Sequence, residues 1–217
     1  MSLSKKVALK QIIINRIFAS LGYAFIFFPI AIIALTFYPV FKAELTYQIS
    51  PHPSVSNITV KPIDSEFSIL IPKININTKV TKNVDPYDSQ EYQIALTKGV
   101  AHAQGSSLPG FPGNTFIFAH SASNWYQANQ YNAVFYLINK LEINDEIIIY
   151  YEGSRYLYLV SEKKIVKNNE INYLTNSPQN SSILTLMTCW PPGTGLSRLL
   201  VIAKPYTPYC QFNQKRR

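Results

Sequence analysis

The feature that most constrains the fold is a pair of β-rich runs joined by a loop near the C-terminal end of the chain. Residues 184–189 alternate leucine with threonine and end on Cys189, and residues 199–203 form a second apolar run directly after Arg198. The residues between Cys189 and Arg198 include two prolines and two glycines, which favour a turn. We therefore expect two adjacent strands that bring a thiol opposite a guanidinium.

This pairing points to nucleophilic catalysis, because a positive neighbour populates the thiolate and a fixed donor stabilises a developing oxyanion. The same chemistry needs a proton carrier. His120 closes the β-rich run 114–119, so it would lie at a strand end where side chains can converge. We predict Cys189, Arg198 and His120 as the catalytic residues.

The chain offers two other histidines as proton carriers. His52 lies in the proline-punctuated stretch 50–54 and is interpreted as a solvated residue. His102 follows a short helix that we expect to be capped by Ser89 and closed by Gly99. A histidine in such a helix-to-loop passage more often packs or hydrogen-bonds than catalyses, so we favour His120.

Three neighbours of these residues are candidates for substrate binding: Ser121, Thr188 and Trp190. Trp190 could shield the thiol or shape a pocket, and an exposed loop aromatic is the competing interpretation. Thr188 should point to the face opposite Cys189 if the strand continues, so its hydroxyl could instead order the backbone. No acidic residue stands out as a third member of a catalytic triad.

These residues resemble the sortase family. Residues 185–189, Thr-Leu-Met-Thr-Cys, fit its TLxTC signature, and Arg198 opens the next strand as it does in that family. The run 113–120 is similar to the sortase strand that ends in histidine, and residues 69–74 are similar to its opening strand. The four motifs occur in the family's order and span about residues 67 to 206.

The resemblance implies a mostly β fold, a closed eight-stranded sortase-type barrel with short helices over residues 67–210. It implies a cysteine transpeptidase that cleaves an LPxTG-like sorting signal through a thioester on Cys189. His120 would move the proton, and Arg198 would stabilise the oxyanion or hold the peptide. The partners would be secreted proteins with a C-terminal sorting signal and an amine on a cell-wall precursor or a pilin.

Two alternatives remain open from the residues. An L,D-transpeptidase also uses cysteine and histidine, but it expects a Ser-x-Gly-Cys pattern, and here Met187 and Thr188 precede Cys189. A surface-tethered β-domain without turnover is the second alternative. We expect no cofactor and no metal, because no acidic cluster has evident ligand spacing.

The positive charge is placed at the two ends of the chain. The formal net charge is +8, yet seven of the 20 basic residues lie in residues 1–41 and in the last three positions. The thirteen that remain nearly balance the 12 acidic residues. A nucleic-acid-binding domain would carry its basic excess on the folded face, so we do not expect a nucleic-acid partner.

An uncharged run of 25 residues, 17–41, follows a basic N-terminal segment, 1–16. About 20 apolar residues cross a bilayer, so we predict an uncleaved transmembrane anchor. A cleaved signal peptide is the alternative, but the run is longer than a usual signal core. The basic side should stay in the cytoplasm and the following domain outside. Residues 42–66 would be a linker, and residues 211–217 a basic tail.

The rest of the chain suggests many short strands and few helices. The first strand candidate is residues 67–76, which Pro72 interrupts. Residues 146–160 are β-rich around Gly153 and predict a hairpin, whereas Asp85 and Pro86 predict a turn. An irregular or short helical stretch is expected within 123–131, and one helical turn within 170–175. From the residues alone we expect a closed antiparallel barrel or a sandwich. The two cysteines, Cys189 and Cys210, could pair, but a free Cys189 is the favoured state.

Overall fold

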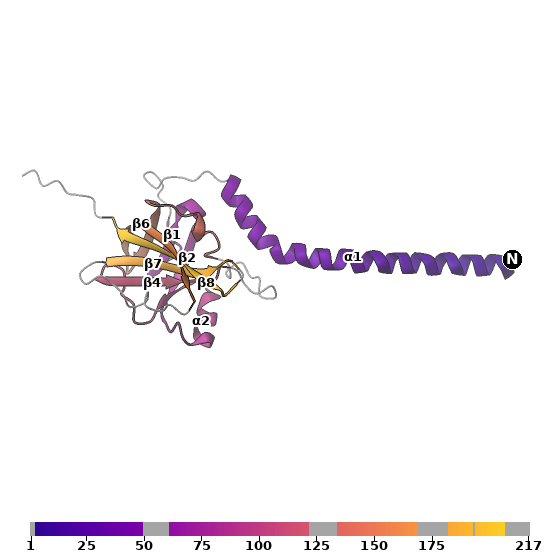
Figure 1. Ribbon diagram of the computed structural model, residues 1–217, viewed down its shortest axis with the longest axis horizontal. Coiled ribbons are helices and arrows are strands. Elements are labelled where there is room, and N and C mark those ends of the chain that lie inside the picture. Colours follow the sequence, from indigo (N-terminus) through magenta and orange to yellow (C-terminus); the bar gives the residue numbers. More distant parts are fainter. Residues whose placement is uncertain (1–2, 50–60, 122–133, 169–181, 193, 207–217) are drawn as a thin grey trace, which may run out of the picture. The chain divides into compact units, whose positions relative to one another are not determined.

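The structure of the chain is a computed structural model that describes residues 3–49, 61–121, 134–168, 182–192 and 194–206. The chain divides into two compact units, Met1–Lys42 and Ala43–Arg217, which are described separately. The first contains most of one long helix, and the second contains a β-barrel (Figure 1).

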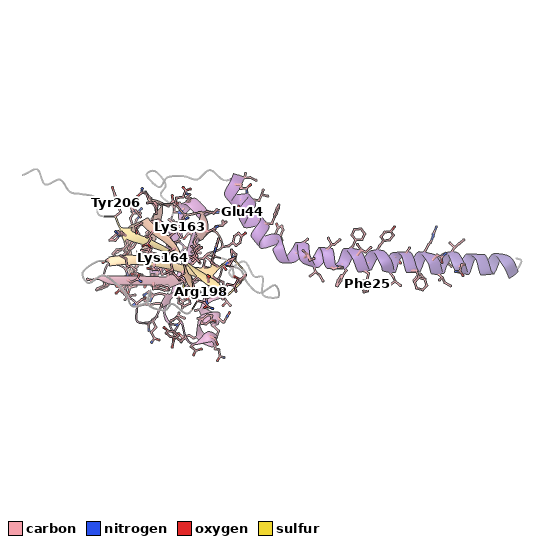
Figure 2. All side chains as sticks on the ribbon, viewed as in Figure 1. Phe25, Glu44, Lys163, Lys164, Arg198 and Tyr206 are labelled. Carbon is pink, nitrogen blue, oxygen red and sulfur yellow. The ribbon has the colours of Figure 1, made fainter. Side chains whose placement is uncertain are left out.

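Helix α1 spans Leu3–Ile49. Within it, Gln11–Leu35 has the length and composition of a membrane-spanning helix, with a mean hydropathy of 2.3 and none of its surface buried in the structure. At 1.5 Å per residue these 25 residues extend about 37 Å, more than the ~30 Å of a bilayer's hydrocarbon core. Phe25, for example, projects from the helix and is 86% exposed (Figure 2). The helix therefore fits a single-pass anchor.

The helix continues beyond the predicted anchor and into the segment that we expected to be a linker. Residues 61–66 of that segment are attached to the barrel: the N–H groups of Glu152 and Gly153 donate to the carbonyl oxygens of Glu66 and Ser65, both at 3.0 Å. Residues 50–60 lie outside the described part of the chain.

The second unit contains a closed eight-stranded barrel, which confirms the predicted fold class. The neighbouring strands around the barrel are β1-β2-β3-β4-β7-β8-β6-β5. A short helix, α2 (Ser89–Leu96), and two 3-10 turns, η2 (Pro72–Ile74) and η3 (Ile138–Lys140), accompany the strands. The strands are β1 (Phe67–Ile71), β2 (Ile76–Val84), β3 (Val100–Ala103), β4 (Gly113–Phe118), β5 (Glu146–Tyr151), β6 (Ser154–Lys167), β7 (Ser182–Trp190) and β8 (Ser197–Pro205).

The expectation of a purely antiparallel sheet is wrong, because β2 pairs with β3 and β4 pairs with β7 in parallel. A parallel pair needs a crossover connection that carries the chain back to the starting end of the first strand. Helix α2 makes that return between β2 and β3. Sequence patterning indicated several of the strands, but not β3 and not the relative directions of the strands.

The opening strand is also divided differently. We expected one strand over 67–76 interrupted by Pro72. Instead β1 ends at Ile71, Pro72 begins the turn η2, and Asn75 adopts a left-handed conformation at φ 54° before β2 runs back along β1. Proline has no N–H for a strand ladder but suits the first position of a helical turn, which explains the break.

Other local predictions agree with the structure. The hairpin of β5 and β6 turns at Glu152 and Gly153, and the side chain of Asp85 accepts the N–H of Tyr87 at 2.8 Å within the predicted turn. The irregular or short helical stretch expected within 123–131 and the helical turn expected within 170–175 lie outside the described residues.

The barrel core is built from apolar side chains of all eight strands, with Phe135, Ile138 and Leu141 added from the segment before β5. On β7, Leu184, Leu186 and Thr188 are buried, whereas Met187 and Cys189 are only partly covered. This alternation separates a buried face of β7 from a face that is accessible near its C-terminal end.

The N-cap of α2 generates a stability prediction. The helix is capped by Asp88 and not by Ser89 as we expected: the Asp88 carboxylate accepts the N–H groups of Gln90 and Glu91 at 2.9 and 3.1 Å. Asp88→Ala should therefore lower the free energy of unfolding by about 1 kcal/mol. Ser89→Ala is the matched control and should change it by less than about 0.5 kcal/mol. Urea unfolding of the full chain in detergent micelles measures both, and equal losses would contradict the assignment.

Candidate active site

Cys189 and Arg198 are direct partners on the antiparallel strands β7 and β8. Residues opposite each other in such a pair project from the same face, with Cβ atoms about 4.5–5.5 Å apart. The register thus brings together the thiol and the guanidinium that the sequence predicted to face each other. On the other side of β8, strand β6 continues the row: Val166 pairs with Arg198 and is buried.

His120 stands at the end of the strand on the other side of β7. The parallel register pairs Phe118 with Met187, and the N–H of Ala119 continues it by donating to the carbonyl oxygen of Met187 at 3.1 Å. If this register continued for two more residues beyond the end of β4, His120 would be level with Cys189. Because β4, β7 and β8 are consecutive in the barrel (Figure 1), the three predicted catalytic residues lie at one end of three adjacent strands.

The side chains of this row are partly accessible. His120, Cys189 and Arg198 are each half-buried. Burial lowers the pKa of His120 below its ordinary value of 6.5, which keeps the imidazole neutral at pH 7. A neutral imidazole can accept a proton from a thiol or an amine.

Arg198, labelled in Figure 2, keeps donors available for a ligand. Its Nη1 donates to the carbonyl oxygens of Ser197 and Gly195, at 3.1 and 3.4 Å. Within the described part of the chain no acidic side chain pairs with it, and a guanidinium has five N–H groups. The group can therefore donate to a substrate oxygen without losing a salt bridge.

The thiol of Cys189 is free, whereas Cys210 lies outside the described residues. A pairing of the two cysteines thus stays an untested alternative. A search of the described ranges finds no group of three or more His, Cys, Asp or Glu side chains that could hold a metal ion.

The three predicted substrate-binding residues differ in exposure. Trp190 is half-buried against the core, at the end of β7 and not in a loop. Thr188 is 2% exposed, and its hydroxyl donates to the carbonyl oxygen of Ala119 at 2.9 Å. Ser121 is 1% exposed, and its hydroxyl has no hydrogen-bond partner among the described residues. A role in substrate binding stays a prediction for all three.

His102 lies in a different environment. It is part of β3 and not of a helix-to-loop passage, and it is 2% exposed. Its Nδ1 accepts the N–H of Asn83 at 3.3 Å, so the proton is on Nε2, which lies 3.1 Å from the carbonyl oxygen of Ser107. The hydroxyl of Ser106 is 2.9 Å from the same Nε2. Both ring nitrogens are thus used inside the fold.

A comparison with family models matches residues 69–206 to the sortase domain. The chain belongs to the sortase family. The match includes all three predicted catalytic residues and the whole row around them. Sortases are cysteine transpeptidases, which agrees with a thiol at the accessible end of a strand.

Solved structures show the same fold. Sortase C from Clostridium perfringens SM101 is 22% identical with a TM-score of 0.53, covering 82% of this chain and 91% of its own. Sortase C-1 from Actinomyces oris is 23% identical with a TM-score of 0.56, covering 80% and 99%. C. perfringens sortase C with the C-terminal cell wall sorting motif is 24% identical with a TM-score of 0.55, covering 80% and 88%. A comparison with curated protein sequences finds no match.

The sequence did not reveal what else borders the reactive row of this sortase. Val166 continues the row on β6, and Leu200 pairs with Met187 two residues further along the strands. Both are ordinary apolar strand residues, so composition marks them only as core. The place of Val166 follows from the register of β6 with β8, and that of Leu200 from the register of β7 with β8. To find Val166 from the sequence, one would need to predict the register between β6 and β8.

The buried state of His102 generates a pH prediction. Burial lowers its pKa below 6.5, so the unfolded chain takes up the proton first as the pH falls. The free energy of unfolding should be highest above pH 6.5 and should decrease as the pH falls below that value toward the pKa of the folded state. His120 contributes with the same sign.

Unfolding of the full chain in micelles between pH 5 and 8 measures this dependence. His102→Gln should lower stability at pH 7.5 by about 1–3 kcal/mol through lost buried hydrogen bonds. It should also weaken the pH dependence. His120→Gln should weaken it too, and the double variant should weaken it further. An unchanged slope in His102→Gln would show that His102 is not the titrating group.

Proposed function

We propose that this sortase is a membrane-anchored cysteine transpeptidase that cleaves a sorting signal and transfers the acyl group to an amine. The observation that carries the proposal is the row in which Cys189 pairs with Arg198 on one side while the strand ending at His120 lies on the other. A nucleophile, an oxyanion donor and a proton carrier at one accessible strand end are the parts that acyl transfer requires.

The first half of the reaction forms a thioester. His120 takes the proton of the Cys189 thiol, and the thiolate attacks the carbonyl carbon of the scissile peptide bond. The bond between Sγ and that carbon forms, the carbon–nitrogen bond breaks, and His120 returns the proton to the leaving amine. Arg198 donates to the carbonyl oxygen while it carries negative charge.

The second half transfers the acyl group. An incoming amine attacks the thioester carbonyl, the new amide bond forms, and the bond to Sγ breaks. The proton of the attacking amine passes to His120, whose pKa is lowered by burial, so a neutral ring is available to receive it. Cys189 leaves as a thiolate and is ready for another cycle.

The substrate class is proposed by likeness. The related sortase C from C. perfringens has been solved with a C-terminal cell wall sorting motif. We infer an LPxTG-like signal on a secreted protein as the acyl donor and an amine of the cell wall or of a pilin as the acceptor. The half-buried Trp190, beside Cys189, is available to contact that signal.

The proposed topology follows from charge. Lys5, Lys6, Lys10 and Arg16 precede the uncharged run 17–41, so the N-terminus would stay in the cytoplasm and the barrel would face outside. Such an anchor keeps the barrel near membrane-attached substrates, which raises their effective concentration.

The test of the reaction class uses the full chain in detergent micelles under reducing conditions, with a library of LPxTG-like peptides and hydroxylamine as the amine. Hydroxamate should form, and mass spectrometry should detect a thioester on Cys189. Cys189→Ala should reduce hydroxamate to background while leaving the melting temperature nearly unchanged, because the thiol is only half-buried.

Absence of hydroxamate from the wild-type chain across the whole library would favour a tethered β-domain without turnover. Loss of folding in Cys189→Ala would instead make the thiol a structural residue.

The two histidines should differ in their effect on turnover. His120→Ala should lower kcat by about 10²–10⁴-fold, which is the usual contribution of a general acid–base. His102→Ala should retain most of kcat per folded molecule, because both ring nitrogens of His102 bond within the barrel. Its melting temperature should fall instead. Steady-state kinetics corrected for the folded fraction measures both variants, and the reverse ranking would reassign the proton carrier.

A further inference from the structure

Among the described residues, none gives His120 the side-chain partner that usually orients a catalytic imidazole. Among the described residues, no side chain or backbone group forms a hydrogen bond with its ring. Strand β4 itself ends at Phe118, two residues earlier. The described contacts at His120 are therefore those of the backbone around it.

Three hydrogen bonds hold the backbone on both sides of His120. The N–H of Ala119 donates to the carbonyl oxygen of Met187 at 3.1 Å, and the N–H of Phe135 donates to the carbonyl oxygen of His120 at 3.3 Å. The third comes from a side chain: the hydroxyl of Thr188 donates to the carbonyl oxygen of Ala119 at 2.9 Å. This last bond is buried, so water cannot replace it readily.

The Thr188 bond joins the two reactive residues by the shortest route that the described contacts provide. Thr188 directly precedes Cys189, and Ala119 directly precedes His120. The hydroxyl therefore links the nucleophile's strand to the histidine's strand at the level of the reacting row. A loss of the bond frees the end of β4 to move relative to β7 at the position where their separation matters most.

We propose that Thr188 is a positioning residue that sets the distance between His120 and Cys189 through its hydrogen bond to the Ala119 carbonyl, and that it does not bind the substrate. This inference rests on the proposed transpeptidase function. In this proposal the imidazole is held in place by a hydrogen bond to the backbone before His120, and not by a carboxylate bonded to the ring. The side chain of Thr188, only 2% exposed and on the face of β7 opposite Cys189, suits this role better than contact with a peptide.

Two substitutions separate the hydroxyl from the rest of the side chain. Thr188→Val keeps the shape and removes the donor, and Thr188→Ser keeps the donor. Ser161→Ala is a matched control, because the Ser161 hydroxyl also donates from one strand to a carbonyl oxygen of its neighbour, that of Ile202 at 3.1 Å. Ser161 lies on β6, away from the reacting row.

The kinetic experiment measures kcat and KM for peptide transfer to hydroxylamine by the full chain in micelles. Thr188→Val should lower kcat by about 10- to 100-fold with KM unchanged, because a displacement near 1 Å costs that much. Thr188→Ser should recover most of kcat, and Ser161→Ala should match the wild type. A raised KM with unchanged kcat would overturn the proposal and return Thr188 to substrate binding.

A second experiment does not depend on activity. NMR of full chain labelled with ¹³C-histidine follows the titration of His120, assigned with His120→Gln. Thr188→Val should raise the pKa of His120 toward its ordinary value, because a loosened strand end exposes the ring to water. Ser161→Ala should leave it unchanged. An unaltered pKa of His120 in Thr188→Val would refute the positioning role of Thr188. Absence of transfer by the wild type would refute only the proposed function.

Discussion

The register of β7 against its two neighbours is the constraint on which the reactive end of this sortase depends. β7 is parallel to β4 and antiparallel to β8, and the two registers place Met187 beside Phe118 and Cys189 beside Arg198. A slip of one residue on either side would turn the thiol away from one of its neighbours. The apolar side chains of Leu184 and Leu186 resist such a slip, because it would move them out of the core.

The same register explains why the site lies where a β7 face is accessible. The barrel core is filled by close-packed apolar side chains, and β7 contributes its buried face to that core. The reactive row lies at the end where the strands stop, and there His120, Cys189 and Arg198 are only half-buried. A peptide can then reach the thiol without entering the core, and the row still gains the rigidity of three hydrogen-bonded strands.

Local features of the fold followed from local sequence patterns. The apolar run in α1, the hairpin around Gly153 and the helix before Gly99 have short-range signals, because turn residues and periodicity act within a few positions. The interruption of the strand by Pro72 was predicted, but not its full consequence: β1 ends before Pro72, which starts a turn. Asp88 was missed as a cap because Asp88 and Ser89 are adjacent and both residue types cap helices well.

The sequence by itself determined which residues are chemically able to act: one thiol at the end of an apolar run, one guanidinium at the start of the next, and a histidine after a third, within motifs that resemble sortases. Only the tertiary structure decided that the strands ending near these three residues are neighbours, that two strand pairs run parallel, and that His102 is used within the barrel. The physical reason is the distance along the sequence over which each kind of interaction acts. Side-chain chemistry and turn preference are properties of a few consecutive residues, whereas register is set by many weak contacts between strands about 70 residues apart, such as β4 and β7.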